Sequence, residues 1–393
     1  MSKHPVVIVG GARTPMGGLQ GNLSGVTAVE LGTVAVKAAI ERSGLKPTDI
    51  EELFMGCVLP AGLKQGPARQ VGINAGLPMS AGCVTLNKLC GSGMQAVIFA
   101  HDQIIAGSYK TMIAGGMESM TNAPHLLPNA RGGVRTGHVE MKDHMLYDAL
   151  EDPVHARPAG AAAQDTADAN GLTREEMDAY SIESVLRAQR AINENLIEAE
   201  ITPVTVKTRK GETVVSTDEQ PLTAKTDKIP TLRPAFKKDG TITAASSSSI
   251  SDGASALVLM HEDEAKAKGV KPLARIVGHS RHSHAPADFT TAPVDAIKKL
   301  LEQTGWSVDD VDLWEVNEAF AMVPMLAMRE VGIDHAKINV HGGGCAQGHP
   351  VGSTGSRIIV TLMYALQHYG KKRGIASLCI GGGEALAVAI ELL

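Results

Sequence analysis

Three residues far apart in the sequence, Cys90, His349 and Cys379, carry the side chains needed for covalent acyl transfer. Cys90 lies in residues 87–94 (Asn-Lys-Leu-Cys-Gly-Ser-Gly-Met), between an apolar stretch and an apolar-periodic run. This pattern predicts a strand, a tight turn and the start of a helix. A thiol there faces unpaired amides and the positive end of the helix, which favour the thiolate. One cysteine to attack, one histidine to activate it and one cysteine to move a proton would form a covalent catalyst.

Each of these residues also has an ordinary structural interpretation. Free cysteine is often a small buried apolar residue, and a lone histidine is most often a satisfied structural group. The Gly-Ser-Gly turn after Cys90 favours chemistry, because small residues let a substrate approach the sulfur. His349 lies in a glycine-rich loop, where a neutral imidazole could accept the Cys90 proton. Cys379 precedes three glycines whose amides could point into a cavity, although a structural cysteine beside a flexible turn fits equally well.

Two polar segments are further candidates for the site. Asn317 follows an expected strand at residues 311–314 and could orient a water or polarise a carbonyl. The alternative is a polar strand end, with Glu318 paired on the surface. Residues 246–249 are four consecutive serines, which fit either a flexible linker or a loop that offers hydroxyls to a polar ligand.

The chain contains an internal repetition, which indicates how these residues are positioned. Residues 37–45 and 298–306 share Lys, Glu and Gly at one offset, and each predicts an amphipathic helix that ends at a C-cap glycine. Further matches follow in the same order, pairing residues 90–93 with 352–355 and residues 112–116 with 379–383. The sequence therefore predicts two similar α/β halves, each alternating strands and helices around a mixed or parallel sheet.

The middle of the chain has a different character. It carries Pro, Gly, His and charge, with one strong helix expected from Thr173 to Asn193, where Thr173 is the N-cap and Glu176 completes a capping box. We interpret it as an insertion that covers the site, although a plain linker domain is possible. The expected division is an N-terminal half at 1–120 and 249–272, an inserted loop domain at 121–248, and a C-terminal half at 273–393.

Composition limits the class of protein. With 393 residues, 44% hydrophobic and 20% charged, the chain fits a soluble globular protein of two or three domains. The net charge of −5 gives no reason to expect nucleic acid or an anionic membrane as a partner. Five cysteines without scaffold spacing favour a reduced compartment, and we expect a cytoplasmic protein without a signal peptide.

Cofactor motifs are weak in this sequence. His282 and His284 are two positions apart, and neither Cys-x-x-Cys nor His-x-x-x-His spacing occurs, so no metal site is expected. Gly10 and Gly11 follow an expected strand, but the Gly-x-Gly-x-x-Gly pattern of dinucleotide sites is incomplete.

Taken in order, the motifs resemble those of the thiolase family over essentially the whole chain. The matching segments are residues 11–15, 87–94, 115–120, 232–236, 317–320, 348–350 and 379–383. Singly these motifs are modest, but their order is highly specific. The resemblance implies a five-layered αβαβα fold of two similar βαβαβαββ halves, with a loop domain inserted in the first half. It also implies a homodimer or homotetramer.

The resemblance assigns roles to the candidate residues. Cys90 would take the acyl group as a thioester, His349 would accept its proton, and Cys379 would move the proton of the acetyl-CoA methyl. Asn317 would hold a water that stabilises the enolate oxygen with His349, and the amides of Cys90 and Gly381 would form a second oxyanion hole. Ser248 matches a serine at the pantetheine arm, and further pocket positions match Ala244, Phe236, Ala319 and Phe320. Coenzyme A thioesters would be substrates, with no resident cofactor.

Several departures from the family pattern concern the substrate. Family members that make acetoacetyl-CoA usually carry His-Met-Gly where this chain has Pro-Ala-Gly at 158–160, and often a Met where it has Phe289. An adenine-stacking Arg is absent, with Lys225 and Lys228 nearby, and His341 and Glu384 also depart from the common residues. Phe289 would shrink the pocket and favour a short acyl chain, or simply repack.

We expect an acetyl-CoA C-acetyltransferase acting on acetoacetyl-CoA. The first alternative is a 3-ketoacyl-CoA thiolase for longer chains. A decarboxylating condensing enzyme of the same fold would pair one Cys with two His, or with His and Asn, and the second cysteine at 379 argues against it. A non-catalytic CoA- or lipid-binding member of the fold is disfavoured by the intact Cys90, His349 and Cys379.

Overall fold

The first half of the molecule is a mixed sheet in the order β4-β3-β5-β12-β1. The computed structural model describes residues 4–209 and 211–393. Strands β3 (Glu52–Gly56), β4 (Gly82–Leu86) and β5 (Thr111–Ser119) are parallel, whereas β12 (Ser251–His261) runs antiparallel to both β5 and β1 (Val6–Arg13). The short β2 (Gly17–Gly18) pairs with β12. The chain returns to this sheet in β12 after the long middle segment, as an insertion requires.

The second half repeats this pattern. Strand β13 (Ala274–Ser283) is antiparallel to β16 (Glu384–Leu392), which is antiparallel to β15 (Arg373–Ile380), and β14 (Leu313–Val316) runs parallel to β15. A single parallel bridge from Trp314 to Ile338 stands where the first half has β4. The internal repetition expected from the sequence is therefore a structural one. The two sheets join through two residue pairs between β1 and β13.

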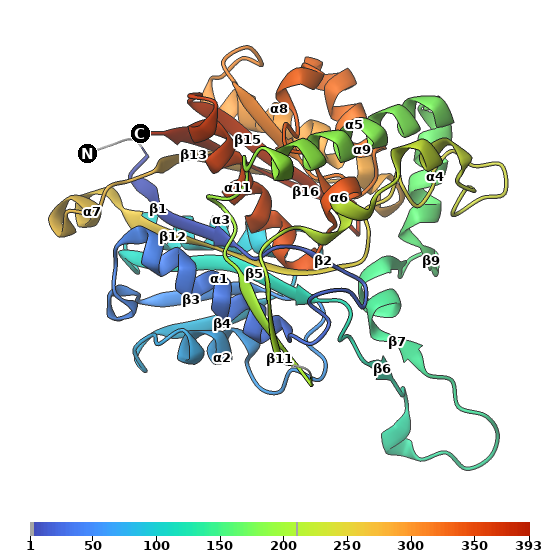
Figure 1. Cartoon of the computed structure of the whole chain (residues 1–393), viewed down its shortest axis with the longest axis horizontal. Helices are drawn as coiled ribbons and strands as arrows, with labels where there is room; N and C mark the ends of the chain where they lie inside the picture. Colours follow the sequence, from blue (N-terminus) through green and yellow to red (C-terminus); the bar gives the residue numbers. More distant parts are fainter. Residues whose placement is uncertain (1–3, 210) are drawn as a thin grey trace.

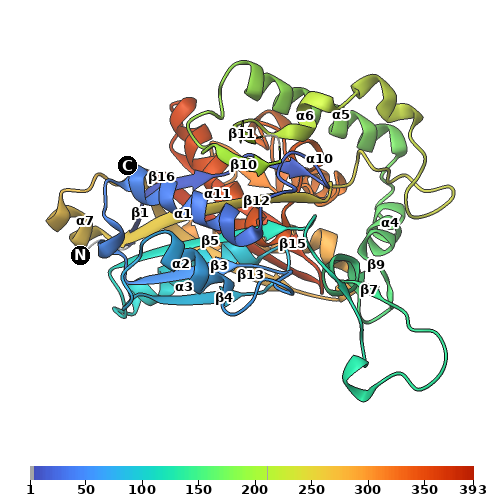
Figure 2. The same cartoon turned by 60° about the horizontal axis from the view of Figure 1, so that its bottom comes forward.

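Helices separate and cover the two sheets (Figures 1 and 2). One apolar core lies between the first sheet and α1 (Ala28–Ser43) and α2 (Pro67–Asn74). A second surrounds α3 (Ser92–Ile105) and α11 (Val351–His368), which pack between the sheets. A third joins the second sheet to α8 (Ala292–Thr304) and α9 (Met322–Ala327). The order helix, sheet, helix, sheet, helix confirms the expected five layers.

Local sequence signals placed several helix ends correctly and one strand incorrectly. Helices α1 and α8 end at Gly44 and Gly305, both in the left-handed conformation with φ of 73° and 70°. The strand expected at residues 311–314 instead covers Leu313–Val316. The reason is Asp312, whose carboxylate accepts hydrogen bonds from the amides of Lys372 and Arg373, at 3.0 and 2.9 Å, and so serves the turn before the strand.

The described residues of the middle segment include three α-helices, a hairpin and a long arm. Helix α5 (Arg174–Asn193) starts after Thr173, and Thr173 and Glu176 form the predicted capping box. It is accompanied by α4 (Ala159–Ala169), α6 (Glu219–Thr223) and the hairpin of β10 (Val204–Thr208) and β11 (Gly211–Val215). The arm, residues 125–143, carries β6 (His125–Leu126) and β7 (Lys142–Asp143) and projects from the body (Figures 1 and 2). The exact bounds of this domain stay a prediction.

A buried ion cluster fastens this segment to the first sheet. The Arg13 guanidinium, fully buried on β1, binds both oxygens of Asp218 at 2.7 and 2.9 Å and one oxygen of Glu200 at 2.6 Å. Removing one partner of such a cluster typically costs about 3–5 kcal/mol, because a charge is left unpaired.

Among the described residues, no helix combines the length and apolar character needed to cross a bilayer.

Candidate active site

Cys90 sits on a strained turn between β4 and α3. The residue before it, Leu89, has φ of +47°, a conformation that costs a non-glycine residue about 1–3 kcal/mol. Neighbouring side chains hold the turn: Asn87 accepts the Leu89 amide at 2.9 Å, and the Ser92 hydroxyl accepts the Lys88 amide and donates to the Leu89 carbonyl at 2.8 and 2.7 Å. The predicted strand, turn and helix are present, and they fix the direction of the thiol.

The lack of side chains at Gly91 and Gly381 allows β15, the strand that carries Cys379, to pack against this turn. A Cβ on Gly91 would lie 2.4 Å from the Ile380 side chain, and a Cβ on Gly381 would lie 3.1 Å from Leu89. Because neither side chain exists, the end of β15 reaches the nucleophile, and the amides of Gly381 and Cys90 lie close enough to the Cys90 sulfur to lower its pKa. Cys379 is fully buried next to Cys90. The structure thus brings Cys90, Cys379 and Gly381 together.

His349 completes the group from the start of α11. Its Nε2 atom lies 3.5 Å from the amide nitrogen of Asn317, and its Nδ1 atom lies 2.6 Å from the Thr354 hydroxyl. The backbone amide of His349 is held by Ser251 and Ser249. Gly348, with φ of 105°, leaves no room for a Cβ against the Ser251 hydroxyl, which explains a glycine before the histidine.

These groups open into one cavity of about 300 Å³. Cys90, His349 and Gly381 line it together with five of the six expected substrate positions: Ser248, Phe236, Ala319, Phe320 and Phe289. The expected position Ala244 is not part of this wall, and Cys379 and Asn317 are fully buried next to Cys90 and His349. Residues 158–160, where the sequence departs from the family pattern, lie in the wall.

Aromatic rings shape the cavity. Phe320 meets Phe236 and Phe289 edge to face, with ring centroids 6.1 and 6.3 Å apart. Three of the five phenylalanines in the chain therefore line this one cavity. Such a rigid apolar wall with few polar groups is typical of a site for an acyl chain or a small organic ligand.

The acid–base groups are neutral at rest. Burial raises the pKa of Cys90 to about 11, and the two donated amides only partly offset it. Burial, with the nearby Arg357 cation, lowers the pKa of His349 to about 3. The expected shift of Cys90 toward the thiolate is therefore not found, because burial raises its pKa by more than the neighbouring amides lower it. Burial also raises the pKa of Cys379 well above its ordinary value.

Two buried glutamates that sequence reasoning missed hold the site in place. Glu118, fully buried at the end of β5, accepts the amides of Val58, Leu59 and Gly352 at 2.9, 3.1 and 3.0 Å. It thereby fixes the start of α11, which carries His349. Burial raises the Glu118 pKa to about 7. The signal in the sequence was a carboxylate inside an otherwise apolar strand, residues 111–119.

Glu318 is the second missed residue. The alternative interpretation of this segment placed it on the surface, but it is fully buried and accepts hydrogen bonds from Tyr180, Ser184 and Asn339 at 2.9, 2.7 and 3.0 Å, and from the Cys345 amide. Tyr180 and Ser184 belong to α5, so Glu318 ties the inserted segment to the loop beside Asn317. A single sequence gives no sign that these partners meet.

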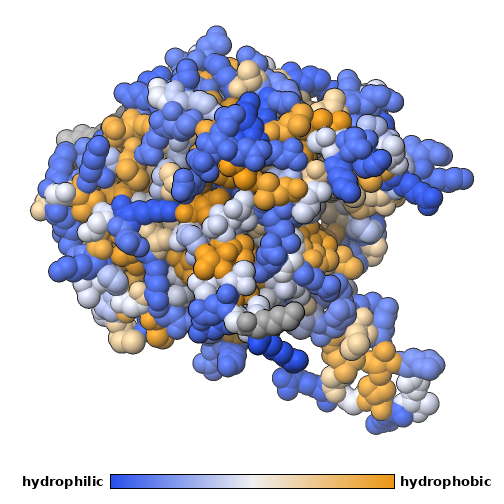
Figure 3. Space-filling view, viewed as in Figure 1, coloured by the Kyte–Doolittle hydropathy of each residue, from blue (hydrophilic) through white to orange (hydrophobic). Residues whose placement is uncertain are grey.

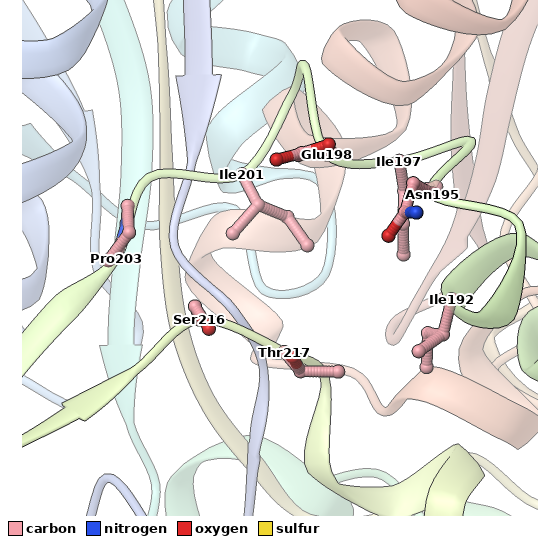
Figure 4. Close-up of a pocket in the computed structure, with 8 residues that line it drawn as sticks. All are labelled: Ile192, Asn195, Ile197, Glu198, Ile201, Pro203, Ser216 and Thr217. Carbon is pink, nitrogen blue, oxygen red and sulfur yellow. The ribbon is translucent and has the colours of Figure 1, made fainter.

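Other hollows and clusters lie apart from these residues. A hollow of about 340 Å³, lined by Ile192, Glu198 and Thr217 among others, contains none of the expected catalytic side chains (Figure 4). In the described part of the chain, two groups have the donors for a metal ion, His101 with Asp102 and His279, and His282 with His284 and Asp295. None of these six residues lines the Cys90 cavity.

Comparisons with known proteins match the whole length of the chain to one family. The family model described as "Thiolase, N-terminal domain" matches residues 6–263, and "Thiolase, C-terminal domain" matches residues 270–392. The acetyl-CoA acetyltransferase of Schizosaccharomyces pombe is 44% identical over 393 residues, covering 100% of both chains. That of Chromobacterium violaceum is 44% identical over 388 residues, covering 98% of this chain and 99% of its own.

Solved structures give the same result. A thiolase of Ascaris suum in complex with coenzyme A has a TM-score of 0.94 and 40% identity, covering 99% of this chain and 100% of its own. The acetyl-CoA acetyltransferase of Bacillus anthracis has a TM-score of 0.96 and 40% identity, covering 99% of each chain.

The raised pKa of Cys90 predicts slow, strongly pH-dependent alkylation. Below a pKa of about 11 the thiolate fraction rises tenfold per pH unit, so modification by iodoacetamide should accelerate steadily from about pH 7 to about pH 10. The rate is measured by peptide mass spectrometry, and a Cys90→Ser variant identifies the modified peptide. A rate that levels off near pH 7 would contradict the neutral resting state.

Proposed function

The chain belongs to the thiolase family, and from this membership we propose that it is an acetyl-CoA acetyltransferase. It joins two acetyl-CoA molecules into acetoacetyl-CoA and free CoA, or runs the reverse thiolysis. Relatives 42–44% identical over nearly the full length carry this name. The observation that carries the mechanism is the single cavity lined by Cys90, His349 and Gly381, with Cys379 and Asn317 beside them.

In the first half-reaction Cys90 attacks the thioester carbon of acetyl-CoA. Its proton passes to the Nε2 atom of His349, CoA leaves as the thiol, and the acetyl group remains on the sulfur. The amides of Cys90 and Gly381, which lie near the sulfur and lower its pKa, would hold the developing oxyanion. One such donor is typically worth about 10²–10³ in rate.

In the second half-reaction Cys379 first gives its own proton to Nε2 of His349 and then, as the thiolate, removes a methyl proton from another acetyl-CoA. The resulting carbanion attacks the acetyl carbon, and Cys90 leaves as a thiolate that takes the proton back from His349. While His349 carries that proton, its Nε2–H and the side-chain amide of Asn317, 3.5 Å apart, would donate hydrogen bonds to the enolate oxygen. In thiolysis the same thiol gives its proton to the carbanion, and the raised pKa of Cys379 favours that protonated form.

The partners are coenzyme A thioesters. Ser247 and Ser248 face the cavity and offer hydroxyls to the amides of a pantetheine arm. The Ascaris suum thiolase was solved with coenzyme A, which supports the same class of ligand here. We further propose a cytoplasmic location, since all five cysteines are free, and we propose that CoA is a substrate and that no resident cofactor is needed.

We propose a homotetramer, built as a pair of dimers. Strand β4 forms the open edge of the first sheet, has no charge or proline, and exposes Val84. Such an edge pairs readily with its own copy about a two-fold axis. The arm, residues 125–143, exposes Leu127, Val134, Val139 and Met141 away from the body, and Figure 3 shows apolar surface on it. It is suited to bind a second dimer.

A 3-ketoacyl-CoA thiolase for longer chains is the second candidate, and one observation favours it. A hollow of about 260 Å³ adjoins the active cavity and shares a wall with it. The shared residues are Ala149, Leu150, Glu151, Ala159, Phe289 and Gly381. An acyl chain longer than acetoacetyl would have space there if Phe289 turned aside.

Two alanine variants separate the half-reactions. Cys90→Ala should lose all labelling by radioactive acetyl-CoA, because the nucleophile is gone. Cys379→Ala should keep the label but lose about 10²–10⁴ in acetoacetyl-CoA synthesis, because the proton transfer is lost. Labelling and spectrophotometric synthesis assays measure both. Undiminished labelling of the Cys90→Ala protein would exclude its role as nucleophile.

Chain length decides between the two substrate candidates. Thiolysis of 3-ketoacyl-CoA substrates of rising length should be fastest for acetoacetyl-CoA, because Phe289 closes the cavity. Each methylene that does not fit should cost about 1–3 kcal/mol in transition-state binding. The measurement is kcat/KM along the series. A maximum at longer chains would replace the acetoacetyl assignment with the alternative.

The assembly makes a separate prediction. Replacing residues 130–139 by a short Gly-Ser link should convert tetramers to dimers, whereas Val84→Asp should weaken the dimer itself. Light scattering after gel filtration measures the mass. Val214→Asp, on the exposed face of the β11 hairpin, is the matched control and should remain tetrameric. If the protein without the arm still forms tetramers, the arm does not join the dimers.

A further inference from the structure

The inner nitrogen of His349 meets a single hydroxyl group. Its Nδ1 atom lies 2.6 Å from Thr354 Oγ1, and Thr354 is fully buried in the first turn of α11. The same hydroxyl lies 3.1 Å from the Pro350 carbonyl oxygen, four residues back. The outer nitrogen, Nε2, is directed to Asn317. Whether the neutral imidazole carries its proton on Nδ1 or on Nε2 therefore depends on these partners.

The Pro350 carbonyl, which can only accept, favours one of the two possible arrangements of protons. A threonine hydroxyl has one proton to donate and lone pairs to accept, and a neutral imidazole has one N–H. With Thr354 donating to the Pro350 carbonyl at 3.1 Å, a lone pair of its oxygen faces Nδ1 at 2.6 Å and can accept an Nδ1–H. Nε2 is then the unprotonated nitrogen. The amide N–H of Asn317, 3.5 Å away, points at that lone pair and agrees with this assignment.

The other half of the molecule uses the same arrangement. Ser92 and Thr354 hold equivalent places in the repeated segments 90–93 and 352–355. The Ser92 hydroxyl donates back to the Leu89 carbonyl at 2.7 Å and accepts the Lys88 amide at 2.8 Å. In both halves a hydroxyl at the helix start donates to a preceding carbonyl; its second partner is the Lys88 amide in the first half and the His349 ring in the second.

We propose that Thr354 is a positioning residue that holds His349 as the Nδ1–H tautomer, so that Nε2 can take the Cys90 proton. This inference rests on the proposed function, in which His349 is the base for Cys90. Thr354 also accepts the Nδ1–H of the imidazolium that forms when the proton arrives. That contact matters because burial and the Arg357 cation both disfavour a charged His349.

Two variants separate the hydroxyl from the packing of the side chain. Thr354→Val keeps the branched shape inside α11 but removes the hydroxyl, whereas Thr354→Ser keeps the hydroxyl and removes a methyl group. Thr354→Val should slow acetylation of Cys90 in single-turnover experiments by about 10–100-fold, part of the roughly 10²–10⁴ that general base catalysis supplies. Its KM should stay within about twofold, and Thr354→Ser should stay within about threefold of the wild-type rate.

Nitrogen-15 NMR of histidine-labelled protein reads the tautomer directly, and the spectrum of a His349→Asn variant identifies the His349 signals. The wild type should show the proton on Nδ1, and Thr354→Val should show part of it on Nε2. A wild-type proton on Nε2, a full acetylation rate in Thr354→Val, or equal losses in both variants would overturn the proposal. If acetyl-CoA fails to label even the wild type, the proposed function fails, while the NMR result still decides the tautomer.

Discussion

The close contact of α3 and α11 in the middle layer is the constraint on which the site depends. A Cβ on Gly93 would lie 2.7 Å from the Ser356 amide of α11, and a Cβ on Gly355 would lie 2.3 Å from the Met94 amide of α3. These glycines occupy equivalent places in the two halves, so neither helix has a side chain at the point where the other crosses it. The starts of both helices then meet, and each start carries one of the reacting groups, Cys90 or His349.

That contact also determines the electrostatics of the site. Two helix starts packed in the core between the sheets leave little solvent, which disfavours a charge on either Cys90 or His349. If Cys90 and His349 were already an ion pair, the site would stabilise charges in the ground state as well as in the transition state. A neutral pair develops its charges only as the substrate reacts, so the stabilisation applies to the transition state. The donors for those charges, the amides of Cys90 and Gly381, are part of the rigid backbone and need no reorganisation.

The sequence predicts what local rules and motifs determine. Gly44 and Gly305 marked helix ends, Thr173 and Glu176 marked a helix start, and the repeated segments predicted two similar halves. What could not be predicted depends on contacts between distant residues. Glu118 reaches Gly352 across 234 positions, and Glu318 is buried only because α5 covers it. The pKa of Cys90 was misjudged for the same reason, because desolvation depends on all the neighbours rather than on the helix alone.

Buried charged residues explain how an inserted segment can hold the residues of the cavity wall in fixed positions. Loops on a surface move, yet Phe236 and Ser248 must keep their place relative to Cys90. The segment is anchored at Arg13 through Glu200 and Asp218, and at Glu318 through Tyr180 and Ser184. Such pairs add little net stability, because desolvation offsets much of the attraction, but a displaced partner would leave a buried charge unpaired. The anchors therefore favour one position of the inserted segment over all others. A purely apolar contact of the same area would tolerate small displacements of the segment more easily, because no charge would lose its partner.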